Sequence, residues 1–295
     1  MNRFLGILLI TISAASFGTL AIIGRFAYAD GVDVTTLLFL RFSIAAVLML
    51  AWMWLRKEPL PRGSTLLQLA GMGGLGYVGQ SFCYMSAIQY ASAGLVALLL
   101  YLYPVLVTIL TVLFHKTKLT RRTILALVLA TAGAALTANP RGGQLVGILL
   151  AVAAALIYSF YIMVGAGVMK KVSSLQSSAV IFTSAALVFG SITAIRGAHW
   201  PASSTGWFAL AGIALLSTIL PVATFLAGLK IIGPTDASLL STLEPVVTVI
   251  LAALILGEPV YSFMLAGGAL ILAAVVLTAS KRDENTLPVR DTSSP

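Results

Sequence analysis

Residues 239–258 read LLSTLEPVVTVILAALILGE, and residues 98–117 read LLLYLYPVLVTILTVLFHKT. Aligned at an offset of 141 positions, the two stretches share eight identical residues, including a proline inside each apolar run. Each run is expected to form a helix that bends at its proline, because proline lacks the backbone N–H and crowds the preceding turn. Only the second stretch carries a carboxylate, Glu244, directly before the proline. The pair predicts an internal repeat whose two copies differ at the residue before the proline.

The overall composition is that of a membrane protein. Of the 295 residues, 59% are hydrophobic and 9% are charged, with a mean hydropathy of +1.03, whereas soluble domains carry roughly 25% charged residues. The net charge of +9 comes from basic residues in short connectors, so membrane topology explains it better than nucleic-acid binding does. The single cysteine, Cys83, excludes an intrachain disulfide, and no Cys/His cluster has metal-ligand spacing. Neither a metal nor a cofactor is expected.

Ten apolar runs are long enough to cross a bilayer core, which takes roughly 17 to 25 helical residues. They lie at approximately 4–24, 35–55, 66–87, 93–114, 122–139, 144–168, 175–196, 204–228, 236–256 and 261–279. Because the connectors are short, we predict one all-α integral membrane bundle without a separate soluble domain. The polar tail, residues 281–295, is expected to be disordered and cytoplasmic.

The repeat extends through the whole chain in a gap-free register. At the same offset, the tetrapeptide GILL at residues 6–9 recurs at 147–150, and the tripeptide LTA at 136–138 recurs at 277–279. The later copy of GILL lies in mid-chain, so the first run is expected to be a retained span and not a cleaved signal peptide. We predict two five-helix repeats, residues 1–140 and 141–280. An odd number of spans inverts the second repeat relative to the first, a plan that recurs in secondary transporters.

The basic residues predict the orientation, because cytoplasmic loops carry an excess of lysine and arginine. With the N-terminus inside, the inner loops and tails hold Arg3, Arg56, Lys57, Arg62, Lys116, Lys118, Arg121, Arg122, Lys170, Lys171, Lys230, Lys281, Arg282 and Arg290. The outer loops hold only Arg25, Arg141 and Arg196. Both termini are therefore expected in the cytoplasm.

The prolines Pro104 and Pro245 fall near the middle of the fourth and ninth spans. One interpretation is a pair of kinks tolerated for packing, since proline is common in membrane helices. The other is a pair of hinges that open alternate sides of the membrane. Their symmetric placement at mid-depth favours the hinges.

Two charged residues lie within predicted spans. Glu244 is about 12 Å deep at 1.5 Å per residue and is expected to face the bundle interior, where it shares one side with Ser238, Ser241 and Thr248. That stripe is either a cavity wall or the surroundings of a structural carboxyl bonded to backbone freed at the kink. Arg41, in the second span, either snorkels outward or pairs internally, and a structural role is favoured.

Polar and aromatic residues mark a candidate pocket. In the third span, Tyr77, Gln80, Ser81 and Tyr84 recur at i, i+3, i+4 and i+7, which places them on one helix face. Aromatics with few fixed charges are typical of a site for a small, partly apolar solute. The candidate substrate-binding residues are Tyr77, Gln80, Ser81, Tyr84, Tyr101, Tyr103, Tyr158, Tyr161, Ser241 and Glu244.

The chain resembles the EamA-type members of the drug/metabolite transporter superfamily. The resemblance rests on ten spans in two halves, on Leu243-Glu244-Pro245 followed by Gly257-Glu258, and on Arg41-Phe42 early in the second span. The first half departs from the pattern, with Tyr103 before its proline and Lys116-Thr117 in place of Gly-Glu. The chain is most similar to bacterial inner-membrane exporters of aromatic and other neutral amino acids.

The resemblance implies a transporter that works by alternating access, and a monomer is compatible with it. The alternative within this class is a proton-coupled extruder of cationic drugs, in which Glu244 binds the cation or exchanges it for a proton. An enzyme is not expected, because the spans hold no paired carboxylates, Ser/His pair or metal ligands at membrane depth. Phosphorylated solutes would call for several inward-facing basic residues, and only Arg41 meets that need.

Overall fold

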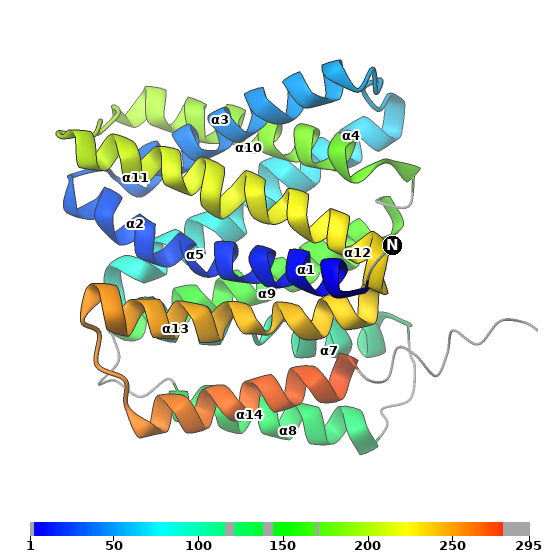
Figure 1. Cartoon of the computed structure of the whole chain (residues 1–295), viewed down its shortest axis with the longest axis vertical. Coiled ribbons are helices and arrows are strands. Elements are labelled where there is room, and N and C mark those ends of the chain that lie inside the picture. Colours follow the sequence, from blue (N-terminus) through cyan, green and yellow to red (C-terminus); the bar gives the residue numbers. More distant parts are fainter. Residues whose placement is uncertain (1–2, 116–120, 138–143, 169–170, 280–295) are drawn as a thin grey trace, which may run out of the picture.

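The computed structural model describes residues 3–115, 121–137, 144–168 and 171–279. In these ranges the chain is helical, and no β-strand occurs. The helices lie side by side across the molecule (Figure 1). The fold is the predicted all-α bundle.

The first half contains the first five predicted spans, three of which are interrupted. Its helices are α1 (Arg3–Gly18), α2 (Leu20–Ala29), α3 (Val34–Leu55), α4 (Gly63–Gly71), the π-helix η1 (Met72–Tyr77), α5 (Val78–Tyr90), α6 (Ala93–Leu100), α7 (Tyr103–His115) and α8 (Arg121–Thr137). The first span is divided at Thr19, the third by η1, and the fourth between Leu100 and Tyr103.

The second half repeats this plan. Its helices are α9 (Leu145–Val168), α10 (Ser174–Arg196), α11 (Ser204–Ala214), the π-helix η4 (Leu215–Ile219), α12 (Leu220–Ser241), α13 (Leu243–Leu256) and α14 (Ser262–Ala279). Helical hydrogen bonding in α12 continues through the connector predicted at 229–235, so helical turns join the eighth and ninth spans.

Two of the backbone irregularities follow the repeat, whereas the division at Thr19 has no counterpart in the continuous α9. Subtracting 141 from the bounds of η4 gives 74–78, which overlaps η1 at 72–77. Subtracting 141 from Thr242, which separates α12 from α13, gives Tyr101, which lies in the break between α6 and α7. Repeat-equivalent helices also pack against each other, α3 against α10 at one edge of the bundle and α8 against α14 at the other (Figure 1). The two halves therefore share local geometry as well as sequence.

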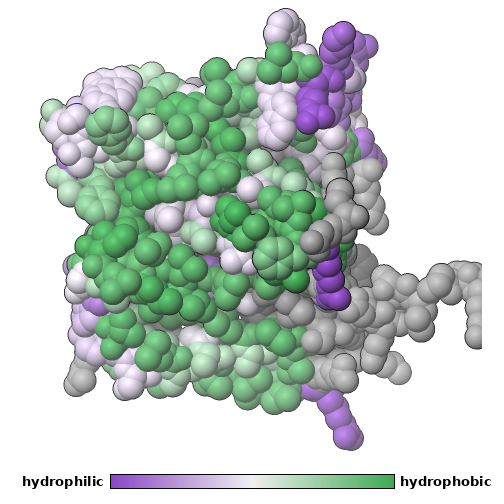
Figure 2. All heavy atoms as spheres, viewed as in Figure 1, coloured by the Kyte–Doolittle hydropathy of each residue, from purple (hydrophilic) through white to green (hydrophobic). Residues whose placement is uncertain are grey.

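The surface is that of a multi-pass membrane protein. Within the described ranges, five helices are long and apolar enough to cross a membrane: Arg3–Ala29, Val34–Leu55, Leu145–Gly165, Ser174–Arg196 and Ser204–Leu229. Shorter apolar helices are Ala93–Val107, Ile124–Leu136, Leu243–Leu256 and Ser262–Ala274. Large apolar side chains such as Trp54, Ile195 and Phe208 are 77–86% exposed, as a lipid-facing surface requires. Figure 2 shows hydrophobic residues across the middle of the bundle and hydrophilic residues towards the ends of the helices.

Charged residues gather at the helix ends. Of those predicted on the inner side, the structure places Arg3, Arg56, Lys57, Arg62, Arg121 and Lys171 at or next to helix ends. The others in that set, and Arg141, fall outside the described residues or at helical positions whose side chains are not described. The predicted tail, residues 281–295, also lies outside the described residues.

Carboxylates fix two of the loops between spans by accepting hydrogen bonds. Asp33 caps α3 by accepting hydrogen bonds from the backbone N–H groups of Thr35 (3.0 Å) and Thr36 (3.3 Å). Asp30 joins the end of α2 to the start of α11, accepting from the hydroxyl (2.5 Å) and the backbone N–H (3.0 Å) of Ser203. These hydrogen bonds from Ser203 lower the pKa of Asp30 below its ordinary value.

Glycines allow the interrupted helices to approach their neighbours. A Cβ added at Gly73, in η1, would lie 2.6 Å from the carbonyl oxygen and 2.8 Å from the Cα of Ile181 in α10. A Cβ at Gly18 would lie 3.0 Å from the carbonyl oxygen of Glu244. Close packing of η1 on α10 therefore requires a glycine at position 73, whereas nothing lies within 4 Å of such a Cβ at Gly71.

Candidate functional site

Five of the predicted site residues form one continuous set of ring contacts, here called the tyrosine series. Tyr101 contacts Tyr103 (ring centroids 5.7 Å apart), and Tyr103 contacts Tyr158 at 4.9 Å. Tyr158 stacks on Tyr161 at 5.8 Å, and Tyr161 contacts Tyr77 at 5.8 Å. The series connects the α6–α7 break, α9 and η1, which belong to different halves of the repeat.

One end of the tyrosine series meets Glu244. The hydroxyl of Tyr101 lies 3.0 Å from Oε2 of Glu244 and 2.5 Å from the carbonyl oxygen of Ser241. The Tyr101 hydroxyl donates to both oxygens, which shares its one proton in a three-centre hydrogen bond. No basic side chain among the described residues pairs with Glu244. Glu244 is thus a half-buried carboxyl whose hydrogen-bond partner is a side chain, not backbone freed by Pro245.

The other end of the series reaches Arg41. Tyr77 contacts Phe42 with ring centroids 5.4 Å apart, and the guanidinium of Arg41 lies 5.0 Å from the centroid of the Phe42 ring. Arg41 is 3% exposed, so it does not snorkel outward. Its Nε donates to Oγ1 of Thr218 (2.9 Å), and Thr218 in turn donates to the carbonyl oxygen of Ile213 (2.8 Å) within the π-helical distortion around η4. Its internal partner is therefore a neutral hydroxyl.

The predicted polar face of the third span contributes Tyr77 to the tyrosine series. Ser81 and Tyr84 are buried, while Tyr77 and Gln80 are half-buried. The hydroxyl of Ser81 donates to Oε1 of Gln80 (3.2 Å). Tyr84 interacts electrostatically with both Glu244 and Arg41. This face, the tyrosine series and the two charged residues together form the candidate site.

Three predicted neighbours of Glu244 have other roles or are not described. The hydroxyl of Ser241 donates to the carbonyl oxygen of Ala237 in its own helix (2.8 Å), so the contribution of Ser241 to the site is its carbonyl group. The hydroxyl of Thr248 lies 3.0 Å from the carbonyl oxygen of Gly18 and 3.1 Å from that of Glu244. It fastens α13 to α1 instead of lining a cavity. The side chain of Ser238 lies outside the described residues.

Both prolines stand in the first turn of a helix that follows a break. Pro104 is the second residue of α7, and Pro245 is the third residue of α13. The missing N–H of proline costs little there, because the first backbone N–H groups of a helix have no partner within it. The backbone is therefore interrupted just before each proline, as predicted, and the hinge function stays a prediction.

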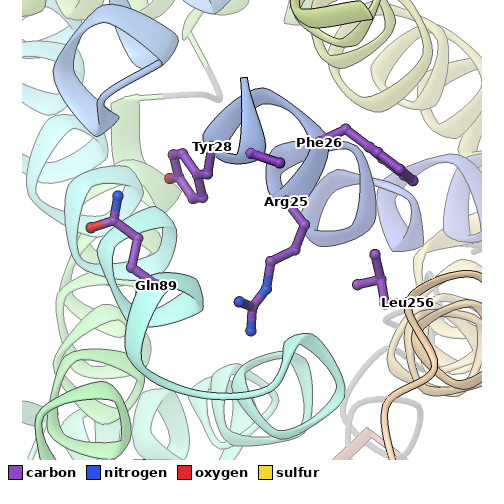
Figure 3. A pocket seen from close by; sticks show the side chains of 6 residues that line it. Arg25, Phe26, Tyr28, Gln89 and Leu256 are labelled. Carbon is purple, nitrogen blue, oxygen red and sulfur yellow. The ribbon is translucent and has the colours of Figure 1, made fainter. Parts of the chain in front are cut away.

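A separate cavity of about 540 Å³ lies beside α2. It is lined by Arg25, Phe26, Tyr28, Ala29, Gln89 and Leu256 (Figure 3). None of the predicted site residues lines it. Tyr28, whose hydroxyl donates to the carbonyl oxygen of Met85 (2.9 Å), interacts electrostatically with both Arg25 and Arg41. Tyr28 is thus a lining residue of this cavity that is fixed to α5 by its hydroxyl group.

The same region contains an ion pair that the sequence did not reveal. Arg25 Nη2 lies 3.6 Å from Oε1 of Glu258 and donates to the carbonyl oxygen of Ala91 (2.8 Å). Glu258 also accepts from the N–H groups of Ala93 (2.9 Å) and Gly94 (3.4 Å) at the start of α6. We call this group the Arg25–Glu258 link. In the sequence, Glu258 was marked by the Gly-Glu pair after the ninth span, but no local pattern identified Arg25 as its partner.

The Arg25–Glu258 link predicts a measurable coupling. The side chains are 33% and 15% exposed, so a double-mutant cycle of Arg25→Gln and Glu258→Gln should give a coupling free energy of about 0.2–1 kcal/mol. Unfolding of the purified protein in detergent would supply the four free energies. Strictly additive effects would show that the two charges do not interact.

Comparison with known proteins agrees with this architecture. An uncharacterized transporter from Archaeoglobus fulgidus is 29% identical over 270 residues, which cover 91% of this chain and 94% of that protein. A crystal structure of another protein superposes with a TM-score of 0.67 at 20% identity, covering 96% of this chain and 99% of the other, and so shares its fold. The model of the EamA-like transporter family matches residues 4–139 and again residues 145–280. Because the two matches cover both halves, the chain belongs to the EamA-like transporter family.

Proposed function

We propose that the protein exports amino acids, aromatic and other neutral types, or closely related metabolites across the bacterial inner membrane by alternating access. The observation that carries this proposal is the tyrosine series, which runs from Glu244 to the Phe42 ring beside Arg41. Aromatic walls with a few polar groups suit a small solute with an apolar side chain and a polar end.

The charges of the site support amino acids over phosphorylated solutes. A phosphate group is usually held by several basic or backbone N–H donors. Arg41 is buried within the bundle, whereas Arg25 is paired with Glu258. Among the described residues, the Arg41 guanidinium has no carboxylate partner, and a single guanidinium matches one carboxylate better than it matches a phosphate ester.

The orientation belongs to the same proposal. Basic residues predominate in the connectors on the side of the N-terminus, which supports cytoplasmic N- and C-termini. Export then requires the candidate site to open to the cytoplasm and to the opposite side in turn, and Pro104 and Pro245 are the proposed hinges.

A second candidate function is the extrusion of cationic drugs in exchange for protons. Glu244 favours it, because a half-buried carboxyl without a basic partner in the described part of the chain attracts a cation. Under this alternative the solute's positive charge would lie beside Tyr101 and Glu244.

Transport by the purified protein in liposomes tests both candidates. The panel comprises labelled amino acids, phosphate esters and cationic dyes, each with and without a pH gradient. Saturable uptake of neutral amino acids above that of protein-free liposomes is expected. Uptake of the dyes alone would favour the drug extruder, and uptake of phosphate esters alone would contradict both.

Gln80 offers a specific check on the site. Replacing Gln80 by leucine removes an amide from the half-buried third-span face at similar bulk, so kcat/KM for the transported amino acid should fall by about tenfold. Gln68→Leu is the matched control, because Gln68 is exposed in the same span. Wild-type transport by a well-folded Gln80→Leu protein would remove this residue from the site.

A further inference from the structure

We propose that Arg41 binds the carboxylate group of the transported solute. This inference deepens the proposed function, on which it rests, by naming the chemical class of the solute as carboxylates with an apolar or aromatic body. It concerns a residue whose role the sequence left open between outward snorkelling and internal pairing.

The Arg41 guanidinium is hydrogen-bonded to the protein through Nε, which leaves its two terminal nitrogens for a ligand. Thr218 accepts from Nε, the nitrogen nearest the side-chain stem, and the Ile213 carbonyl fixes the Thr218 hydroxyl in turn. Among the described residues, the hydrogen bond from Nε to Thr218 is the one that the guanidinium makes, and its two terminal nitrogens make none. Terminal nitrogens of arginine form a planar fork that matches the two oxygens of a carboxylate.

The surroundings of Arg41 supply no negative charge. Its neighbours are Phe42 and the phenols of Tyr28, Tyr77 and Tyr84, none of which is a carboxylate. Glu244 is not among the groups that interact with the guanidinium in the described part of the chain. A buried cation without a counter-ion is unfavourable. A solute carboxylate that reaches Arg41 would accept charge-assisted hydrogen bonds from the guanidinium and neutralise its charge.

The fold itself does not require an arginine at this position. Adding 141 to 41 gives Phe182, the repeat counterpart of Arg41, which is buried and stacks against Phe42 with ring centroids 6.0 Å apart. An apolar side chain thus fills the equivalent position of the second half. Because packing is satisfied there without a charge, the charge of Arg41 is better explained by a ligand.

The position of Arg41 also orients the solute. Phe42 and Tyr77 join Arg41 to the tyrosine series, so a solute whose carboxylate meets Arg41 can lay an aromatic side chain along these rings. Tyr28 lies towards the cavity beside Arg25.

Ligands that differ only in charge test the proposal on the wild-type protein. In detergent, 3-phenylpropionate should raise the thermal unfolding midpoint and phenethylamine at the same concentration should not. In liposomes, L-phenylalaninamide should compete with labelled L-phenylalanine about tenfold more weakly than unlabelled L-phenylalanine does. Equal competition by the amide, together with no stabilisation by 3-phenylpropionate, would overturn the carboxylate site while leaving amino-acid export in place.

Variants then assign the preference to Arg41. Arg41→Gln should abolish the difference between L-phenylalanine and its amide, and Arg41→Lys should retain part of it. Arg196→Gln is the matched control, because it removes an exposed arginine at the end of α10. If Arg41→Gln does not fold, Thr218→Val, which removes the acceptor of Nε, should narrow the same difference.

The outcomes separate this proposal from the proposed function. Binding of 3-phenylpropionate that depends on Arg41, without transport of any amino acid, would support the carboxylate site and contradict amino-acid export. An Arg41→Gln protein that folds and keeps the wild-type preference for the carboxylate would overturn the site.

Discussion

Replacing Glu244 by glutamine should abolish accumulation of solute driven by a pH gradient while leaving solute-for-solute exchange close to wild type. Glutamine keeps a donor for the Tyr101 phenol oxygen and an acceptor oxygen, but it cannot gain or lose a proton. The Tyr101 hydroxyl lies 3.0 Å from Oε2 of Glu244, so the carboxyl has a hydrogen-bond partner with its proton or without it. A carboxyl that releases this proton when the site opens to the other side would couple export to the gradient.

The measurement is uptake by the purified protein in liposomes, with an imposed pH gradient in one experiment and with unlabelled solute inside in the other. Glu244→Ala is the companion variant, because it also removes the hydrogen bond to Tyr101 and should slow exchange by about tenfold. Gradient-driven accumulation by Glu244→Gln at the wild-type level would show that Glu244 is structural and that any coupling lies elsewhere.

Gly73→Ala should give the largest loss of stability among single methyl additions in the third span. The added Cβ would lie 2.6 Å from the Ile181 carbonyl oxygen and 2.8 Å from its Cα. These are backbone atoms, which cannot rotate away as a side chain can, so η1 and α10 must move apart. Overpacking of this kind costs about 1–3 kcal/mol.

Gly71→Ala is the matched control, because nothing lies within 4 Å of the added atom and alanine is the better helix former. Thermal unfolding in detergent should show a lower midpoint for Gly73→Ala and an unchanged or higher one for Gly71→Ala. Equal midpoints for the two variants would mean that the close contact between η1 and Ile181 is absent from the native protein.

The sequence predicted the bundle well because its strongest signals are local. Apolar runs long enough to cross a bilayer identify spans without any knowledge of their partners, and the proline positions marked both breaks in the fourth and ninth spans. The π-helical segments η1 and η4 were not predicted. A π-helical turn depends on which donors bind the carbonyl groups that it displaces, as the Thr218 hydroxyl binds the Ile213 carbonyl oxygen. Such pairings leave no periodic pattern in the sequence.

The candidate site was predicted only in part, because the signals in the sequence are local. Helical periodicity grouped Tyr77 with Tyr84, but periodicity cannot join residues of different spans. Arg41 and Thr218 are 177 positions apart in the chain, and Glu258 is 165 positions from the Ala93 N–H that it binds. The cost of a charge in a membrane singled out Arg41 and Glu244, whereas their neutral surroundings became visible only in the folded chain.

The paired π-helices carry information about the history of the chain. A π-helical turn accommodates one extra residue, and a gain or loss of that residue in one half would have shifted the register of 141 positions on one side of it. The register is uninterrupted, and η1 and η4 overlap within it. The two halves therefore carry the same number of residues through this turn, as expected if the π-helical turn is older than the duplication. Arg41 and Glu244 correspond to Phe182 and Tyr103 in the other copy. The two halves thus share a backbone plan but differ in the charges that they carry.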